Sequence, residues 1–253
     1  MTPPVALTIA AHDPLGGAGI AADLTTFAAL GVHGMVAVTA VTAQRFGSVD
    51  RVVATPADLL AAQLDGIIES SSIAAVKVGL LFDPGQVEVV AERVADGRLP
   101  RPVVDPVMVD GRGQRFVAAE IEAVSRARLF PLAAALTPNR AEAALLGDDP
   151  AELAGLGADL VVVTGGGAAA TDLLVTHDSV VELTGDWVET ANVRGSGCTF
   201  AAAMAGYLAL GADLTSAAQQ AKGFVAERLR DSADWTLGPA GSVGPLSHRV
   251  IPA

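Results

Sequence analysis

The sequence is poor in cysteine and has no long apolar run. Its one cysteine cannot form a disulfide within the chain, which excludes a disulfide scaffold and makes a reducing cytoplasm the expected compartment. No apolar stretch reaches the roughly 18 to 20 residues that a membrane helix needs. The first residues, MTPPVALTIAAHDP, lack the basic start of a signal peptide. The sequence therefore predicts a soluble, cytoplasmic protein with no membrane partner.

Positive charge is also scarce. The chain has 16 Lys and Arg residues against 28 Asp and Glu residues, a formal net charge of −12. Affinity for nucleic acid or anionic lipid is built from many basic side chains, so this balance argues against both as partners. The only lysines are Lys77 and Lys222, so chemistry that needs a lysine has two candidates.

Short apolar runs alternate with longer stretches of helical spacing. This pattern is typical of an α/β fold with a mostly parallel sheet and helices on both faces. The runs predict strands at 5–10, 35–43, 75–78, 103–104, 134–136 and 160–163, and the stretches between them predict helices at 20–30, 56–69, 84–95, 118–129 and 140–146.

The last third of the chain departs from this alternation. Apolar runs at 173–176 and 180–183 flank a turn-like His-Asp-Ser, which predicts an antiparallel hairpin near the far edge of the sheet. Helices are expected at 198–210 and 214–230, before a Gly- and Pro-rich tail. Since no linker or internal repeat divides the chain, we expect one domain over residues 1–253.

A first glycine-rich segment, DPLGGAGI at residues 13–20, follows a predicted strand and opens a helix. Glycines there let the backbone approach a ligand closely, although a plain strand-to-helix turn would look the same. The segment matches neither the dinucleotide fingerprint nor the Walker loop. Asp23, one turn into the helix, either faces back toward the loop or balances the helix dipole.

A second segment, RGSGCT at residues 194–199, opens a helix of small residues. The free amides and the dipole at such a helix start form an anion site that needs no lysine, which suits an acidic protein that handles phosphate. Cys198 lies in the first turn, where the same field is expected to favour its thiolate. The alternative is a small buried hydrophobe.

Polar residues follow two further strands. Asp105 comes directly after the strand at 103–104, and Asn139 and Glu142 come after the strand at 134–136. In an open α/β sheet ligands bind outside the carboxyl ends of the strands, so these groups are expected to converge. They are hard oxygen ligands of the kind that Mg²⁺ takes. Taken singly, Asn139 and Glu142 also read as a helix N-cap and a first-turn acid.

Taken in order, these segments resemble the hydroxymethylpyrimidine and phosphomethylpyrimidine kinases of thiamine biosynthesis, members of the ribokinase-like superfamily. The resemblance runs almost end to end, and the cysteine within GSGCT is its discriminating feature, because most ribokinase-like sugar kinases have an aspartate there. The matching segments are 6–10 (ALTIA), 13–20, 22–24 (ADL), 39–44 (TAVTAQ), 77–80 (KVGL), 105–109 (DPVMV), 137–139 (TPN), 195–199, 221–225 (AKGFV) and 244–248 (GPLSH).

The resemblance implies a three-layer ribokinase-like fold and transfer of the γ-phosphate of ATP, with Mg²⁺, to 4-amino-5-hydroxymethyl-2-methylpyrimidine and then to its monophosphate. Catalysis would be mostly positioning and charge stabilisation. In the matching positions, the amides of Gly195, Ser196 and Gly197 would form the anion hole and Cys198 would act on the substrate hydroxyl. The implied pyrimidine-binding residues are Gln44, Asp23, Gly79, Leu80 and Val107; the nucleotide-binding residues are Asn139, Thr164, Gly166 and Lys222; and the Mg²⁺ ligands are Asp105 and Glu142.

The chain departs from the family pattern on the phosphate side. TGGG at residues 164–167 stands where the family usually has Lys-Gly-Gly-His, and VDGRG at 109–113 where it often has Val-Ala-Lys-Ser-Gly. Loss of these lysines predicts weaker ATP binding or slower transfer unless Arg112 or Arg194 compensates. Two alternatives stay open: a pyridoxal or pyridoxine kinase, and a pyrimidine-binding protein without phosphoryl transfer. Members of the superfamily often form dimers, and an apolar sheet edge would allow a homodimer here.

Overall fold

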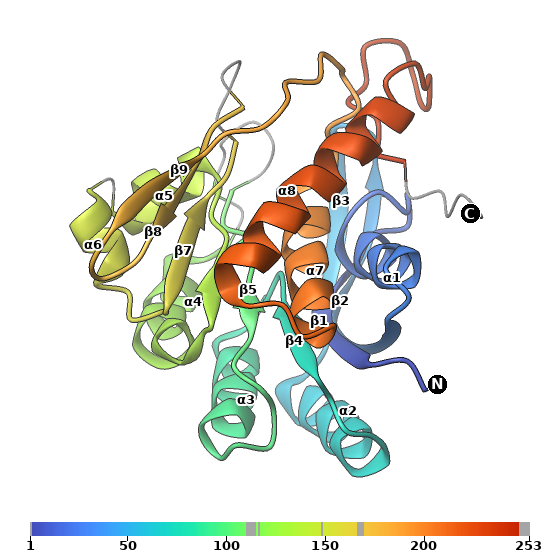
Figure 1. The fold of residues 1–253 in the computed structure, drawn as a ribbon. Helices are drawn as coiled ribbons and strands as arrows, with labels where there is room; N and C mark the ends of the chain where they lie inside the picture. Colours follow the sequence, from blue (N-terminus) through green and yellow to red (C-terminus); the bar gives the residue numbers. More distant parts are fainter. Residues whose placement is uncertain (1, 110–114, 116, 148, 166–169, 248–253) are drawn as a thin grey trace.

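One sheet contains every strand of the described chain (Figure 1). The computed structural model describes residues 2–109, 115, 117–147, 149–165 and 170–247. The strand order is β3-β2-β1-β4-β5-β6-β7-β8-β9, and pairing is parallel from β2 to β7 and antiparallel at both ends. The strands are β1 (Val5–His12), β2 (His33–Arg45), β3 (Ser48–Ala54), β4 (Ala75–Val78), β5 (Val103–Val104), β6 (Ala135–Leu136), β7 (Leu160–Val163), β8 (Asp172–Val175) and β9 (Val180–Leu183).

Helices connect the strands and cover both faces of the sheet. They are α1 (Gly19–Ala29), α2 (Ala57–Ser70), α3 (Pro84–Ala95), α4 (Ala119–Val124), a π-helical turn η1 (Ser125–Leu129), a 3₁₀ turn η2 (Phe130–Leu132), α5 (Arg140–Leu146), α6 (Pro150–Ala154), α7 (Ser196–Ala209) and α8 (Leu214–Asp231). In the described part of the chain, none of these helices combines the length and the apolar character needed to cross a bilayer.

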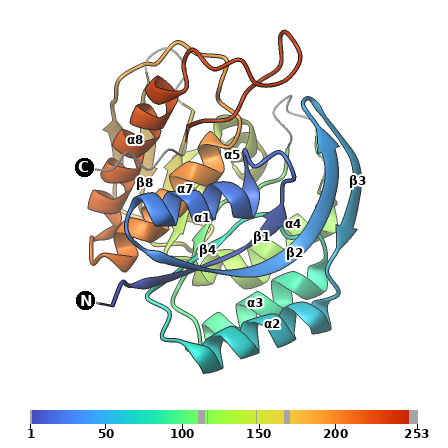
Figure 2. The same cartoon turned by 90° about the vertical axis from the view of Figure 1, so that its right-hand side faces the viewer.

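Alternation along the strands divides the core into two layers. In β4, Val76 and Val78 pack with the residues of α2 and α3 on one face. Ala75 belongs to the other face, with Phe200 and Met204 of α7. Figure 2 shows α1 on one side of the sheet and α2 and α3 on the opposite side. This arrangement is the predicted three-layer sandwich, and it leaves Lys77 of β4 pointing toward α7 because successive strand residues face opposite ways.

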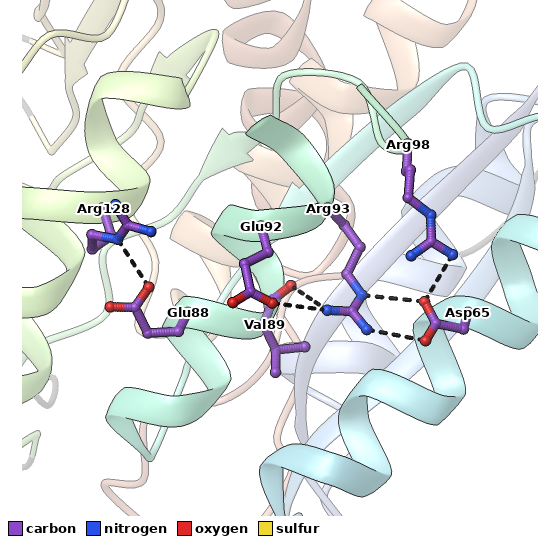
Figure 3. Close-up of polar contacts among 7 residues, drawn as sticks. All are labelled: Asp65, Glu88, Val89, Glu92, Arg93, Arg98 and Arg128. Atoms are coloured by element: carbon purple, nitrogen blue, oxygen red, sulfur yellow. Dashed lines mark hydrogen bonds and ion pairs between the residues drawn. The ribbon is translucent and has the colours of Figure 1, made fainter. Parts of the chain in front are cut away.

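Ion pairs tie together the helices on the α2–α3 face, away from α7 (Figure 3). Arg93 of α3 donates from Nε and Nη2 to the two carboxylate oxygens of Asp65 in α2, at 3.2 and 3.0 Å. Arg98 reaches the same carboxylate at 3.0 Å, and Arg128 of η1 binds Glu88 at 2.9 Å. The hydrogen bond from Arg93 lowers the pKa of Asp65, so this carboxylate stays ionised at neutral pH.

Most predicted elements lie within two residues of their observed bounds. The exceptions are two elements that were not predicted and one predicted helix that is interrupted. The hairpin is confirmed as the antiparallel pair β8–β9 at the sheet edge. β3 and α6 were not predicted. The helix predicted over 118–129 is interrupted: α4 ends at Val124, and a π-helical turn and a 3₁₀ turn carrying Pro131 complete the segment.

Candidate active site

The polar residues of the site follow the carboxyl ends of neighbouring parallel strands. Asp13 follows β1, Gly79 follows β4, Asp105 follows β5 and Asn139 follows β6. Because these strands are adjacent and parallel, their ends meet at one edge of the sheet. Thr164, directly after β7, forms a bridge with Asn139. The predicted convergence of these groups is therefore confirmed.

Two glycine loops pack against each other at this edge. Gly195, the residue before α7, has a φ of 84°, and a Cβ at this position would overlap the carbonyl oxygen of Gly17. Gly19 has a φ of 54°, and a Cβ there would overlap the carbonyl oxygen of Ala11. Only glycine fits such positions, because it alone adopts positive φ without cost and has no Cβ. The glycines of both loops thus hold the start of α1 against the start of α7.

Replacing Gly195 with alanine should lower the free energy of unfolding by about 1 to 3 kcal/mol, because the new Cβ combines a left-handed backbone with an overlap on Gly17. Urea unfolding measures the change. Gly197→Ala is the matched control, since a Cβ there would have open space among the described residues and alanine favours a helix by up to about 1 kcal/mol. An equal loss of stability in both variants would contradict the argument.

A fully buried ion pair lies between the sheet and the helices. The Nζ of Lys77 is 2.9 Å from Oδ2 of Asp23 in α1, and both side chains are 0% exposed. Thr8, paired with Lys77 in register, donates its hydroxyl to the same oxygen at 2.6 Å. Burial alone would lower the pKa of Lys77, but the negative charges of Asp23, Cys198 and Asp105 raise it above its usual value. Lys77 is therefore a permanent positive charge behind the site.

This pair changes the role expected of Asp23. Asp23 was predicted to line the pyrimidine pocket, but its side chain has no exposed surface and binds Lys77 and Thr8. In this structure its partners are therefore Lys77 and Thr8, and its contact with a pyrimidine stays a prediction. No role was assigned to Lys77 from the sequence, although a lysine inside a four-residue apolar strand was a usable signal.

Cys198 occupies the first turn of α7, beside Asp105 and Lys77. The charge of Lys77 and the backbone of Gly19 favour its thiolate, and the charge of Asp105 opposes it. Burial raises the pKa of the Cys198 thiol to about 12, with the charges of Asp105 and Asp23 adding to the effect and Lys77 opposing it. Cys198 is half-buried as a residue, and desolvation of its thiol opposes and outweighs the helix field that was expected to favour the thiolate.

Asn139 and Glu142 form a capping box at the start of α5. The Asn139 side chain accepts hydrogen bonds from the amides of Ala141 and Glu142, and Glu142 Oε2 accepts from the Asn139 amide at 3.0 Å. Glu142 Oε1 accepts from the Met108 amide at 3.2 Å. Burial, followed by the charge of Asp105, raises the pKa of Glu142 to about 8. The capping interpretation of both residues is thus confirmed. The same geometry brings the buried carboxylate of Glu142 close to Asp105.

Asp105 and Glu142 have the chemistry of a magnesium pair. Burial raises the pKa of each, and the charge of Asp105 raises that of Glu142 further, so a nearby divalent cation would relieve the repulsion between the two carboxylates. Mg²⁺ is commonly held by one or two carboxylates, with water and phosphate oxygens completing its shell. Within the described residues no group of three or more His, Cys, Asp and Glu side chains could hold a metal ion by itself, so a pair fits such a shared site better than an all-protein cage.

Of the residues predicted to bind the pyrimidine, Gly79, Leu80 and Val107 follow β4 and β5, and Gln44 lies apart from them on β2. Gly79 and Val107 line one small cavity together with Asp105, and Gly79 lies so close to Lys77 that a Cβ there would be 2.7 Å from its Nζ. The carbonyl of Leu80 accepts a hydrogen bond from the Thr39 hydroxyl at 2.6 Å. The side chain of Gln44 is hydrogen-bonded to Asp13 and Arg194, which lie at the two glycine loops.

The residues predicted for the nucleotide are only partly described. Asn139 and Thr164 are bridged, as above, and Gly166 lies outside the described residues, as does Arg112. Lys222 of α8 forms an ion pair with Asp172 of β8, at 2.7 Å. Its charge is therefore already balanced by a carboxylate at the far part of the sheet, and its contact with a nucleotide stays a prediction.

The chain matches a known protein family over most of its length. A model of the family described as phosphomethylpyrimidine kinase matches residues 13–245, from the first glycine loop to the residue that bridges Arg194. The chain belongs to the phosphomethylpyrimidine kinase family. The resemblance noted from the sequence motifs is thus confirmed.

Relatives of this kinase carry two kinds of name. A hydroxymethylpyrimidine/phosphomethylpyrimidine kinase of Synechococcus elongatus is 41% identical, with 98% of each chain covered. A pyridoxine kinase of Bacillus subtilis is 35% identical over 97% of this chain and 96% of its own. The solved ADP complex of Bacillus subtilis pyridoxal kinase superposes with a TM-score of 0.88 at 33% identity, covering 98% of both chains. The ribokinase-like fold is confirmed, and the protein is a vitamin kinase whose ring substrate these relatives do not distinguish.

Proposed function

We propose that this kinase transfers the γ-phosphate of ATP to the hydroxymethyl group of 4-amino-5-hydroxymethyl-2-methylpyrimidine, and then a second phosphate to the resulting monophosphate. The observation that carries the proposal is the position of Cys198: it lies at the start of α7, within the glycine turn, and its thiol contacts Asp105 at the carboxyl edge of the sheet. The similarity to a hydroxymethylpyrimidine/phosphomethylpyrimidine kinase supports a pyrimidine as the ring of the substrate.

In the proposed reaction, the substrate hydroxyl oxygen attacks the γ-phosphorus and the bond to the ADP oxygen breaks. The amides at the start of α7, at Gly195, Ser196 and Gly197, stabilise the negative charge that spreads over the transferred group. The thiolate form of Cys198, a small fraction near neutral pH, accepts the hydroxyl proton and becomes the thiol, and the positive charge of Lys77 lowers the cost of forming that thiolate. Positioning at fixed backbone groups is the main contribution of the protein.

Asp105 and Glu142 would hold Mg²⁺, as the two adjacent buried carboxylates suggest. When bound, the ion would neutralise charge on the triphosphate. The proposed nucleotide contacts are Asn139, Thr164, Gly166 and Lys222. Two phosphate-side lysines of the family pattern are absent from this sequence, so we expect a high KM for ATP.

A second candidate, a pyridoxal or pyridoxine kinase, is favoured by the 0.88 TM-score to a pyridoxal kinase. Both rings are flat heteroaromatics that carry a hydroxymethyl group, and the anion hole would serve either. The two functions therefore differ at the residues that contact the ring, of which Gln44 is the proposed one. Its amide offers a donor and an acceptor, which matches a ring nitrogen next to an amino group.

A product assay separates these functions. The protein is incubated with ATP, Mg²⁺ and, in parallel, the pyrimidine alcohol, its monophosphate or pyridoxal, and products are identified by mass spectrometry. We expect mono- and diphosphate from the pyrimidine, with a higher kcat/KM than for pyridoxal. A higher kcat/KM for pyridoxal would establish the second candidate. Binding of the pyrimidine in calorimetry without any product would show a binding protein and overturn the kinase proposal.

The proposed kinase acts as one domain in the cytoplasm. All described strands share one sheet, which supports a single domain. A homodimer stays a prediction. The β2–β3 ribbon, visible at the edge of the sheet in Figure 2, carries the cross-strand pair Val41 and Val53, both exposed, and such apolar side chains suit a contact between two copies.

A further inference from the structure

The side-chain amide of Gln44 lies between two charged groups from distant parts of the chain. Its Nε2 donates to Oδ1 of Asp13 at 2.6 Å, and its Oε1 accepts from Nη2 of Arg194 at 3.1 Å. The same Nη2 of Arg194 donates to Oδ2 of Asp13 at 2.9 Å. The three side chains therefore close a ring of hydrogen bonds that joins β2 to both glycine loops.

The two partners are themselves held in place. Oδ1 of Asp13 also accepts a hydrogen bond from the Leu15 amide at 2.9 Å, and the Asp13 side chain is only 4% exposed. The amide of Arg194 donates to the carbonyl of Gly244 at 2.9 Å. Because both ends of the ring are anchored in backbone, Gln44 meets a fixed carboxylate on one side and a fixed guanidinium on the other.

This arrangement determines which way the amide faces. An ionised carboxylate only accepts hydrogen bonds and a guanidinium only donates them, so Nε2 must face Asp13 and Oε1 must face Arg194. Turning the amide by 180° would set Oε1 against the carboxylate and Nε2 against the guanidinium, and both hydrogen bonds would be lost. Charge complementarity thus fixes an orientation that an isolated glutamine would be free to change.

We propose that Asp13 and Arg194 are positioning residues that select the ring substrate through Gln44. They leave one N–H and one oxygen lone pair of the amide, in a fixed order, for the ligand. A ring edge with an acceptor nitrogen next to an amino group pairs with both: the nitrogen accepts from the free N–H of Gln44, and the amino group donates to the free lone pair of Oε1. A pyridoxal-type ring has an ionised hydroxyl, and its negative oxygen would repel Oε1 when it faces that atom. This inference rests on the proposed function, in which Gln44 contacts the ring.

The test compares kcat/KM for the aminopyrimidine alcohol with kcat/KM for pyridoxal. Asp13→Asn keeps the shape of the side chain but can donate or accept, so the amide is free to turn, and Arg194→Met removes the second constraint. In each variant we expect the preference for the aminopyrimidine to fall about tenfold, chiefly through a higher KM for that ring. A tenfold change corresponds to roughly 1.4 kcal/mol, the size expected for the loss of one hydrogen bond. The KM for ATP should change less than the KM for the ring.

Two further variants separate positioning from structural support. Arg194→Lys retains a charged donor and should restore most of the lost preference, which a defect in folding alone would not show. Asp50→Asn breaks the exposed Arg45–Asp50 pair, 2.6 Å apart and beside Gln44 on the same ribbon, and should leave the preference unchanged. If Asp13→Asn does not fold, the two Arg194 variants carry the comparison.

The possible outcomes distinguish this inference from the function on which it rests. Wild-type protein that phosphorylates neither ring would overturn the proposed function and the inference together. An active wild type whose Asp13→Asn and Arg194→Met variants keep the same preference, or lose activity equally on both rings, would overturn the inference alone. A selective fall in preference that Arg194→Lys reverses would support it.

Discussion

Replacing Cys198 with alanine should lower kcat for phosphoryl transfer by about 100- to 10,000-fold, the range expected when a positioned proton acceptor is removed. Alanine keeps the glycine turn and the amides of the anion hole but cannot take the hydroxyl proton. Single-turnover transfer from ATP to the pyrimidine alcohol measures the chemical step directly. The KM for ATP should stay close to that of the wild type, since no phosphate contact is assigned to the thiol.

The pH dependence of the wild type gives an independent test of the same role. Burial raises the pKa of the Cys198 thiol to about 12, so only a small fraction is thiolate near neutral pH. If the thiolate is the active form, kcat/KM should rise by roughly tenfold per pH unit above neutrality, and Cys198→Ala should lose this slope. Full wild-type turnover in the alanine variant, or an unchanged slope, would show that another group takes the proton.

The strands that the sequence indicates most clearly are those buried on both faces. β4 and β7 are four-residue strands in which every residue is buried, and such runs differ clearly from the helices around them. β3 is the opposite case: it includes Asp50 and Arg51, most of its residues are exposed, and its composition resembles a loop. Its usable signal was Gly47, whose φ of 84° closes the two-residue turn between β2 and β3.

For the site, the edge of the sheet was predictable but side-chain pairing was not. Parallel topology requires Asp105 and Asn139 to share an edge, so their proximity follows from the strand pattern. Lys77 and Asp23 are 54 positions apart in the sequence, and nothing local indicates that α1 places its carboxylate over β4. The thiol of Cys198 shows the same limit: the sequence reveals the helix start, whereas the pKa depends on how much protein surrounds the sulfur.

Replacing Lys77 with methionine should lower the free energy of unfolding by about 3 to 5 kcal/mol, because it leaves the carboxylate of Asp23 buried without its cation. Thr8 alone would remain as a partner of that oxygen. Urea unfolding of the wild type and the variant measures the loss. The only other lysine, Lys222, pairs with Asp172 nearer the surface, with 13% and 7% of the side chains exposed, so Lys222→Met should cost less.

The pH dependence of this stabilisation has a definite sign. The pKa of Lys77 is raised in the folded protein, so its contribution is fully present below the unfolded lysine pKa of about 10.4 and is lost only as the pH rises through the folded value. The difference between wild type and Lys77→Met should therefore persist from pH 7 to pH 9, and it should grow with pH as far as the unpaired Asp23, whose pKa burial raises, is protonated in the folded variant. A difference that disappeared within this interval would mean that the pair is not charged as the structure indicates.

A double variant separates the pair interaction from the cost of a buried charge. Lys77→Met combined with Asp23→Leu removes both charges and fills the space with apolar atoms, and it should recover most of the stability lost in Lys77→Met, because replacing a whole buried pair is often neutral. If the double variant is as unstable as the single one, packing and not charge explains the loss. If instead it recovers stability but not kcat, the positive charge of Lys77 is needed beside Cys198 for the reaction and not for the fold.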